Sequence, residues 1–250
     1  TNTNANTNTN ANANANNLLT SNRLLGITVG SEAIYREDVT VETAIGYLDA
    51  VRGLLRKHNL SDTIPAAIVD IAPIYSNSQQ LRLASDVIAT NTFPFWEGIP
   101  VELATNELEI DLGWLLGLPE TVGKKFVLGE HGWPSDGFIE GTGTAGPEQQ
   151  RRYLADSFCY LRRKNWEYYL FTGIDNDWRQ IQDPNNSIEG NWGILTSDLR
   201  LKEHLVGLEF RCDHDGSVHS FGLVDWSVPE LQNSNGNGDG NGDGNGDGNG

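Results

Sequence analysis

Two glutamates follow short apolar stretches, and their position along the chain indicates chemistry. The stretch 126–129 ends at Glu130, and the stretch 24–31 ends at Glu32. Each stretch has the length and composition of a buried strand. Catalytic residues of parallel α/β barrels collect at the carboxyl ends of the strands, so both side chains would face the enclosing loops. Two such carboxylates fit glycoside hydrolysis, although either glutamate could equally be a solvated residue or a helix cap.

The rest of the chain alternates between strand and helix patterns. We predict strands at 24–31, 64–75, 85–93, 125–130 and 166–174, helices at 40–58, 101–116, 147–165 and 199–208, and a helical turn at 80–83. The helices are predicted from apolar residues at helical spacing. This alternation predicts the α/β class with a parallel sheet, which would carry both glutamates to one edge.

Composition bounds the class of protein. The chain has 250 residues, 38% of them hydrophobic, with a formal net charge of −17. No basic patch is present, so we expect no nucleic-acid partner, and no apolar run is long enough to span a membrane. Residues 1–22 (Asn, Thr and Ala) and 229–250 (Asn, Gly and Asp) are expected to be disordered, which leaves 23–228 as one folded domain.

Three features leave alternatives open. Cys159 and Cys212 could form a disulfide if the chain is secreted, or could both be free thiols. The segment 239–244 matches the start of a calcium loop, but the bidentate glutamate is lacking, which favours a flexible acidic tail. Residues 209–228 could add a short β element or pack as a tail.

Five segments in order carry a family resemblance. Residues 26–36, 91–96 and 129–135 resemble the signatures of glycoside hydrolase family 17, the β-1,3-glucanases of plants and fungi, and 168–179 and 189–195 follow in the family's order. The serine before the first glutamate, and the Tyr-Arg pair after it, resemble the fungal cell-wall branch. The similarity covers roughly residues 23 to 200.

The resemblance implies an eight-stranded (β/α)8 TIM barrel, of which only five strands are visible. By motif order these correspond to the family's fourth to eighth strands. The first three units would precede residue 23, where the Thr, Asn and Ala tract cannot supply them. We therefore expect an incomplete barrel.

The resemblance also implies a retaining mechanism, with Glu32 as general acid/base and Glu130 as nucleophile. Candidate substrate-binding residues are the aromatic and polar side chains of the strand-end loops: Tyr35, Asn91, Phe93, Trp96, Trp133, Asp175 and Trp178. No cofactor and no metal is expected. The implied partner is a β-1,3-glucan polysaccharide, and the implied location is extracellular or the cell wall.

The expected function is a retaining endo-β-1,3-glucan hydrolase. One alternative is a β-1,3-glucanosyltransferase, and another is a glucan-binding barrel without catalysis. Two residues depart from the family pattern. His131 stands where the family usually has a small residue or threonine, and it could hydrogen-bond Glu130. Thr172 stands where many fungal members carry a glutamate.

Overall fold

The computed structural model describes residues 24–182, 187–208 and 212. The expected lead (1–22), the tail (229–250) with its calcium-loop segment, and most of 209–228 lie outside these residues. Among the described residues, no helix has the length and apolar character needed to cross a membrane.

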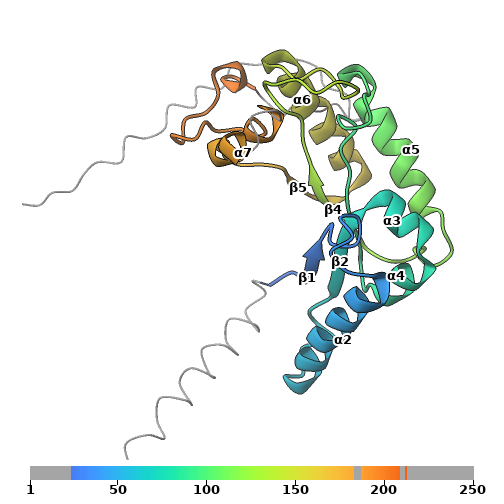
Figure 1. Ribbon diagram of the computed structural model, residues 1–250. Coiled ribbons are helices and arrows are strands. Elements are labelled where there is room, and N and C mark those ends of the chain that lie inside the picture. The colour runs from blue at the N-terminus through green and yellow to red at the C-terminus, as the bar shows by residue number, and fades with distance from the viewer. Residues whose placement is uncertain (1–23, 183–186, 209–211, 213–250) are drawn as a thin grey trace, which may run out of the picture.

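Five parallel strands form one sheet in sequence order, which is a partial α/β barrel as predicted (Figure 1). The strands are β1 (Ile27–Ser31), β2 (Ala66–Ile71), β3 (Ile88–Asn91), β4 (Phe126–His131) and β5 (Glu167–Leu170). The helices are α2 (Val41–Lys57), α3 (Ala72–Asn77), α4 (Gln79–Ala84), α5 (Ala104–Leu116), α6 (Pro147–Lys164) and α7 (Asp177–Gln182), with 3-10 turns at Val101–Leu103, Ser187–Gly190 and Glu203–Leu205. Figure 1 shows α2 to α6 in an arc along one side of the sheet.

The two faces of the sheet differ in the size of their side chains. On the helix side, Ile68 and Leu128 pack with buried leucines of α2, α5 and α6 to form the main core. Because side chains alternate along a strand, the residues on either side of Ile68 and Leu128 in the sequence point to the opposite face of the sheet. On that face Ala67, Val69 and Ala89 form a small apolar layer. The helix-facing core therefore fixes which residues point inward.

The predicted strand 64–75 ends early, because Ala72–Asn77 is the helix α3. Pro73 lies in the first turn of α3, where a residue without an N–H is well tolerated. Tyr75 is fully buried, and its hydroxyl donates to the Ile68 carbonyl oxygen at 2.5 Å and contacts Ser85 Oγ at 2.9 Å. The apolar character of this segment thus reflects a buried helix rather than a longer strand.

The predicted helix at 199–208 is wrong. Leu199 has a φ of 66°, in the left-handed region, and Leu201 forms an antiparallel bridge with Leu195. Only Glu203–Leu205 is helical, as a single 3-10 turn. The Lys202 N–H donates to the Ile194 carbonyl oxygen, and the Arg200 carbonyl accepts the Thr196 N–H, so these groups are not available for helical hydrogen bonds. The helix α7, in contrast, was not predicted.

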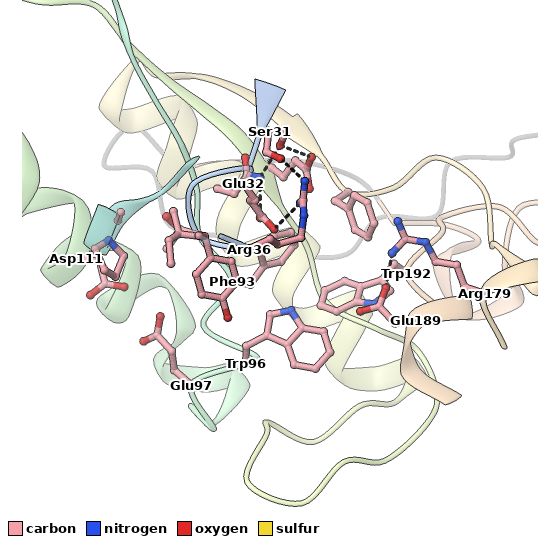
Figure 2. A pocket seen from close by; sticks show the side chains of 18 of the residues that line it. Ser31, Glu32, Arg36, Phe93, Trp96, Glu97, Asp111, Arg179, Glu189 and Trp192 are labelled. Atoms are coloured by element: carbon pink, nitrogen blue, oxygen red, sulfur yellow. Dashed lines mark hydrogen bonds and ion pairs between the residues drawn. The ribbon is translucent and has the colours of Figure 1, made fainter. Parts of the chain in front are cut away.

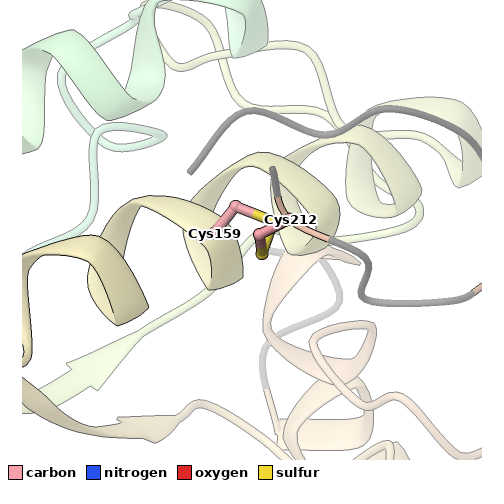
Figure 3. Close-up of a disulfide and its surroundings, with 2 residues drawn as sticks. All are labelled: Cys159 and Cys212. Carbon is pink, nitrogen blue, oxygen red and sulfur yellow. A yellow bond between two sulfur atoms is a disulfide. The ribbon is translucent and has the colours of Figure 1, made fainter. Parts of the chain in front are cut away.

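The two cysteines are joined. Cys159 on α6 and Cys212 form a disulfide with an S–S distance of 2.02 Å (Figure 3). This answers the alternative that the sequence left open. The bond ties a residue from the end of the described chain to the middle of α6.

Both glutamate-bearing strands contain an irregularity just before the glutamate. On β4, Thr90 pairs with Leu128 but the next residue, Asn91, pairs with Glu130, so Gly129 is an extra residue. Without it, alternation would direct Glu130 to the helix side with Leu128. The bulge instead turns the carboxylate inward, as bulges beside functional sites often do. On β1 a similar register shift lies between Thr28 and Ser31.

The β4 bulge needs a glycine at position 129, and substituting this glycine tests the role of the bulge. A Cβ at Gly129 would lie 2.7 Å from Asn91 Oδ1 and 2.8 Å from Val69 Cγ1. We expect Gly129→Ala to lower the free energy of unfolding by about 1–3 kcal/mol, measured by urea denaturation. The control is Gly113→Ala on α5, where a Cβ meets nothing within 4 Å. It should be neutral or stabilising by up to about 1 kcal/mol. Equal effects of the two substitutions would contradict the role of the bulge.

Candidate active site

A cleft of about 1070 Å3 lies at the carboxyl ends of the strands, as the positions of the glutamates predict (Figure 2). It is lined by Ser31, Glu32, Tyr35, Arg36, Ile71, Ala72, Pro73, Asn91, Thr92, Phe93, Trp96, Glu97, Asp111, Glu130, Phe171, Trp178, Arg179, Glu189 and Trp192. Most of these residues come from the carboxyl ends of the strands and from the loops that follow them, and others come from the helices α3, α5 and α7.

A chain of hydrogen bonds joins the two carboxylates across this cleft. Asn91 Nδ2 donates to Glu32 Oε1 at 2.8 Å and also lies 3.2 Å from Ser31 Oγ. The Ser31 hydroxyl in turn donates to Glu130 Oε1 at 3.5 Å. Asn91 on β3 sits between the strands that carry the glutamates, so one amide reaches both sides. The sheet thus brings together two carboxylates that lie 98 positions apart in the sequence.

Two arginines balance part of this negative charge. Arg36 Nη1 lies 3.8 Å from Glu32 Oε2, and Arg36 Nη2 donates to the Ser31 carbonyl oxygen at 3.0 Å. On the other side of the cleft Arg179 forms an ion pair with Glu189, as Figure 2 shows. The Arg179 guanidinium also lies 5.3 Å from the centre of the Trp178 ring.

Burial raises the pKa of Glu130 above its ordinary value, and the charge of Glu32 raises it further. The hydrogen bond from Ser31 and the charges of Arg179 and Arg36 lower it again. Burial therefore opposes ionisation at the residue expected to be the nucleophile. The two arginines and the serine hydroxyl are the groups that favour its ionised form.

Aromatic side chains form one wall of the cleft. Trp192 is buried, and its ring centre lies 5.3 Å from that of Phe93 and 5.6 Å from that of Trp96. Several buried polar atoms have no hydrogen-bond partner within the described residues, and three belong to this lining: Asn91 Oδ1, Thr92 Oγ1 and Trp192 Nε1. Such atoms beside aromatic faces suit a ligand that offers both C–H faces and hydroxyls.

Figure 2 shows a separate acidic end of the cleft, at Glu97 and Asp111. Burial, together with the charges of Asp111 and Glu107, raises the pKa of Glu97 to about 7. The carboxylate oxygens of these three residues lie within 4.8 Å of one another. Glu97 therefore holds a proton more readily than an ordinary glutamate does.

Most, but not all, of the predicted site residues meet in the cleft. Those that line it are Glu32, Tyr35, Asn91, Phe93, Trp96, Glu130 and Trp178. Trp133 is 1% exposed, and its indole N–H donates to the Thr144 carbonyl oxygen at 2.9 Å. Asp175 pairs with buried Lys202 at 2.8 Å and accepts the Gly193 N–H. The structure places both behind the cleft wall.

The sequence predicted Trp192 as one of the aromatic residues of a stacking cleft, and it does line the cleft. Sequence reasoning did not single out Arg179, Glu189 or Thr92. Arg179 and Glu189 stand within the segments 168–179 and 189–195 that carried the resemblance. Their charges were visible, but their place in the cleft depends on the geometry of the loops.

The model of the BtgE/BtgC glycoside hydrolase domain matches residues 1–193 of this chain. A glucan 1,3-beta-glucosidase of Schizosaccharomyces pombe is 30% identical over 185 residues, covering 72% of the chain and 56% of the relative. A probable glucan endo-1,3-beta-glucosidase of Aspergillus terreus is 28% identical over 197 residues, covering 72% and 30%. The chain thus spans about half or less of these relatives' length.

Among solved structures, a glycoside hydrolase family 17 beta-1,3-glucanosyltransferase of Rhizomucor miehei matches with a TM-score of 0.64 and 28% identity, covering 79% of this chain and 70% of that one. An active-site mutant of the Rhizomucor enzyme, in complex with laminaritriose, matches with the same TM-score of 0.64. The resemblance to family 17 and the barrel fold are confirmed by these matches.

His131 points away from the cleft, because the β4 bulge reverses the faces of the strand. Its Nδ1 lies 3.1 Å from the Tyr153 hydroxyl of α6, and it is 2% exposed. The hydrogen bond that His131 could have made to Glu130 is therefore not formed. Burial lowers the pKa of His131 from 6.5 to about 3, so the side chain is neutral in the folded protein.

The buried imidazole makes stability depend on pH. An unfolded chain binds a proton at this histidine below about pH 6.5 whereas the folded chain does not until about pH 3, so the free energy of unfolding falls as pH drops through this window. The slope from one such group is at most about 1.4 kcal/mol per pH unit. We expect His131→Gln to reduce this slope in urea melts between pH 4 and 6.5, and His58→Gln, at an exposed position, to leave it unchanged. An unaltered slope in His131→Gln would contradict the assignment.

Proposed function

The chain belongs to the BtgE/BtgC glycoside hydrolase domain family, and on that premise we propose that it acts as a retaining endo-β-1,3-glucan hydrolase. The observation that carries this proposal is the pairing of Glu32 and Glu130 in one cleft through Asn91 and Ser31. The names of the curated relatives support the substrate class, since they are glucan 1,3-beta-glucosidases.

In the first step we assign the Glu130 carboxylate as the nucleophile that forms a bond to the anomeric carbon. The bond from that carbon to the leaving oxygen breaks, and Glu32 gives its proton to the oxygen. In the second step Glu32 takes a proton from water, and the water oxygen replaces the Glu130 ester. Two inversions at one carbon retain its configuration. Asn91 and Ser31 hold both carboxylates during these steps.

The lining supports a glucan chain as substrate. Tyr35, Phe93, Trp96 and Trp178 offer ring faces to the apolar faces of glucose units, and Asn91 and Thr92 offer polar atoms to hydroxyls. The Rhizomucor transferase, as its active-site mutant, was solved with laminaritriose, a further argument for β-1,3-linked glucose. The sequence also predicts that Trp133 and Asp175 bind substrate, and this stays a proposal. Neither residue lines the cleft, so each would act by supporting the residues that do.

A second candidate is β-1,3-glucanosyl transfer, which uses the same covalent intermediate but passes the sugar to a second glucan. The specific observation in its favour is the match to the Rhizomucor transferase. Product lengths separate the two, because transfer alone yields chains longer than the substrate.

We also propose an extracellular or cell-wall location. The Cys159–Cys212 disulfide supports it, because disulfides persist in oxidising compartments. The glucan-acting relatives support it as well.

The central assignment predicts a large loss of activity on substituting the nucleophile. Glu130→Ala should lower the release of reducing ends from a linear β-1,3-glucan by at least about 10³-fold, because no covalent intermediate can form. The matched control, Glu42→Ala, removes an exposed glutamate from α2, outside the cleft. It should retain full activity. Undiminished release by Glu130→Ala would remove the residue from this role.

The charges around Glu130 predict a pH dependence. Since burial and Glu32 raise its pKa, kcat/KM should fall on the acid side at a pH above the ordinary glutamate value of 4.5. Arg179 lowers this pKa, so Arg179→Gln should move the acid limb to a higher pH. Lys57→Gln, which removes an exposed charge from α2, should not move it. A limb that stays in place or moves to lower pH in Arg179→Gln would contradict the electrostatic account.

A further inference from the structure

A buried carboxylate lies beneath the loop that carries Glu32. Asp70 on β2 is fully buried, and it does not line the cleft. Its Oδ2 accepts the Ile34 N–H at 3.0 Å and the Tyr35 N–H at 3.4 Å, and its Oδ1 accepts the Ile71 N–H at 2.9 Å. Asp70 thus connects the end of β2 to the turn that begins immediately after Glu32.

The backbone at Glu32 is one that needs such support. Its φ is 55°, in the left-handed region, which is unfavourable for a residue other than glycine. The Glu32 N–H donates to the Val69 carbonyl oxygen at 2.9 Å, and the Glu32 carbonyl accepts the Arg36 N–H at 3.0 Å. Three residues lie between Glu32 and Arg36, and Asp70 accepts the N–H groups of two of them, Ile34 and Tyr35.

Within the described residues, only these backbone hydrogen bonds explain why a carboxylate stands at position 70. Asp70 has no cation partner there: its favourable partners are backbone N–H groups, and the nearby charge of Glu32 is repulsive. A buried carboxylate without an ion pair costs free energy, so a shape-matched amide would be less costly. An amide, however, has one acceptor oxygen, and its NH2 group would face an N–H donor. Only a carboxylate can accept hydrogen bonds at both oxygens, from Ile34 and Tyr35 at Oδ2 and from Ile71 at Oδ1.

We propose that Asp70 is a positioning residue for the general acid, and that it fixes the backbone of Glu32 so that the carboxyl group reaches the leaving oxygen. This proposal rests on the proposed function. Asp70 does not line the cleft, so its loss should act through Glu32, which protonates the leaving oxygen in the first step and takes a proton from water in the second. The burst from an activated substrate reports the first step alone. The glucan leaving group departs as a poor alkoxide unless it is protonated, whereas 2,4-dinitrophenolate leaves without a proton.

The test compares two rates on the same preparation of the 250-residue chain. One is turnover of linear β-1,3-glucan, and the other is the pre-steady-state burst of dinitrophenolate from 2,4-dinitrophenyl β-laminaribioside. For Asp70→Asn we expect glucan turnover to fall about 10- to 100-fold and the burst rate to stay within about threefold of the wild type. Glucan turnover is divided by the amplitude of the burst, which counts the folded active sites, so that the ratio of the two rates does not depend on the folded fraction. Asp70→Ser, which keeps one small acceptor, is the second variant if Asp70→Asn does not fold.

The matched control is Asp86→Asn, at the opposite end of β2. Asp86 Oδ2 accepts the Ala66 N–H at 2.8 Å, so this substitution also disturbs a carboxylate that binds the backbone of β2. It should leave the ratio unchanged. Equal losses on both substrates in the Asp70 variants, or no loss on either, would overturn the positioning role.

The Glu32→Ala variant distinguishes a failure of the proposed function from a failure of the role proposed for Asp70. It should show the same dependence on the leaving group as the Asp70 variants, and a larger one. A wild-type chain that is inactive on both substrates, or a Glu32→Ala variant without this dependence, would overturn the proposed function and this inference with it. A normal Glu32→Ala signature beside an unaltered Asp70→Asn ratio would overturn the inference alone.

Discussion

The direction of the two cleft glutamates depends on irregular strand pairing. A regular β4 would send Glu130 into the core between sheet and helices, where an ionised carboxylate is costly. The extra residue Gly129 reverses this, and it simultaneously sends His131 toward α6. A single backbone feature therefore exposes the charged residue and buries the neutral one. The bulge is possible because glycine leaves room for the Asn91 side chain.

Once turned inward, the carboxylates are held by neighbours that differ in kind. Asn91 and Ser31 connect them directly, while Arg36 and Arg179 supply opposing charge from the two sides of the cleft. Behind the aromatic wall, Lys202 pairs with Asp175 and its Nζ lies 2.6 Å from Ser135 Oγ, which joins separate loops to each other. The cleft is thus a layer of functional groups supported by a second layer of buried polar contacts.

The sequence predicted the parts of this structure that depend on local pattern. Apolar runs placed all five strands, and the position of Glu32 and Glu130 after such runs placed both at the carboxyl edge. Local pattern was insufficient where tertiary contacts decide. The apolar segment 72–77 is a helix because Tyr75 is buried against β2, and Leu199 turns away from a helix toward the Leu195 bridge. Trp133 was indistinguishable in sequence from a cleft residue, because composition does not show which side of a wall a ring occupies. Gly129 was visible, but only the register shows that it reverses the face of Glu130.

The most direct test of the account is to trap the covalent intermediate. A 2-deoxy-2-fluoro-β-laminaribiosyl fluoride reacts with the nucleophile of a retaining glycosidase, and the slowed second step leaves the sugar attached. Mass spectrometry of a digest of the labelled chain then identifies the residue. We predict one label per chain, on the peptide that contains Glu130 and at that side chain. A label on another residue, or turnover of the reagent with inverted configuration and no label, would contradict it.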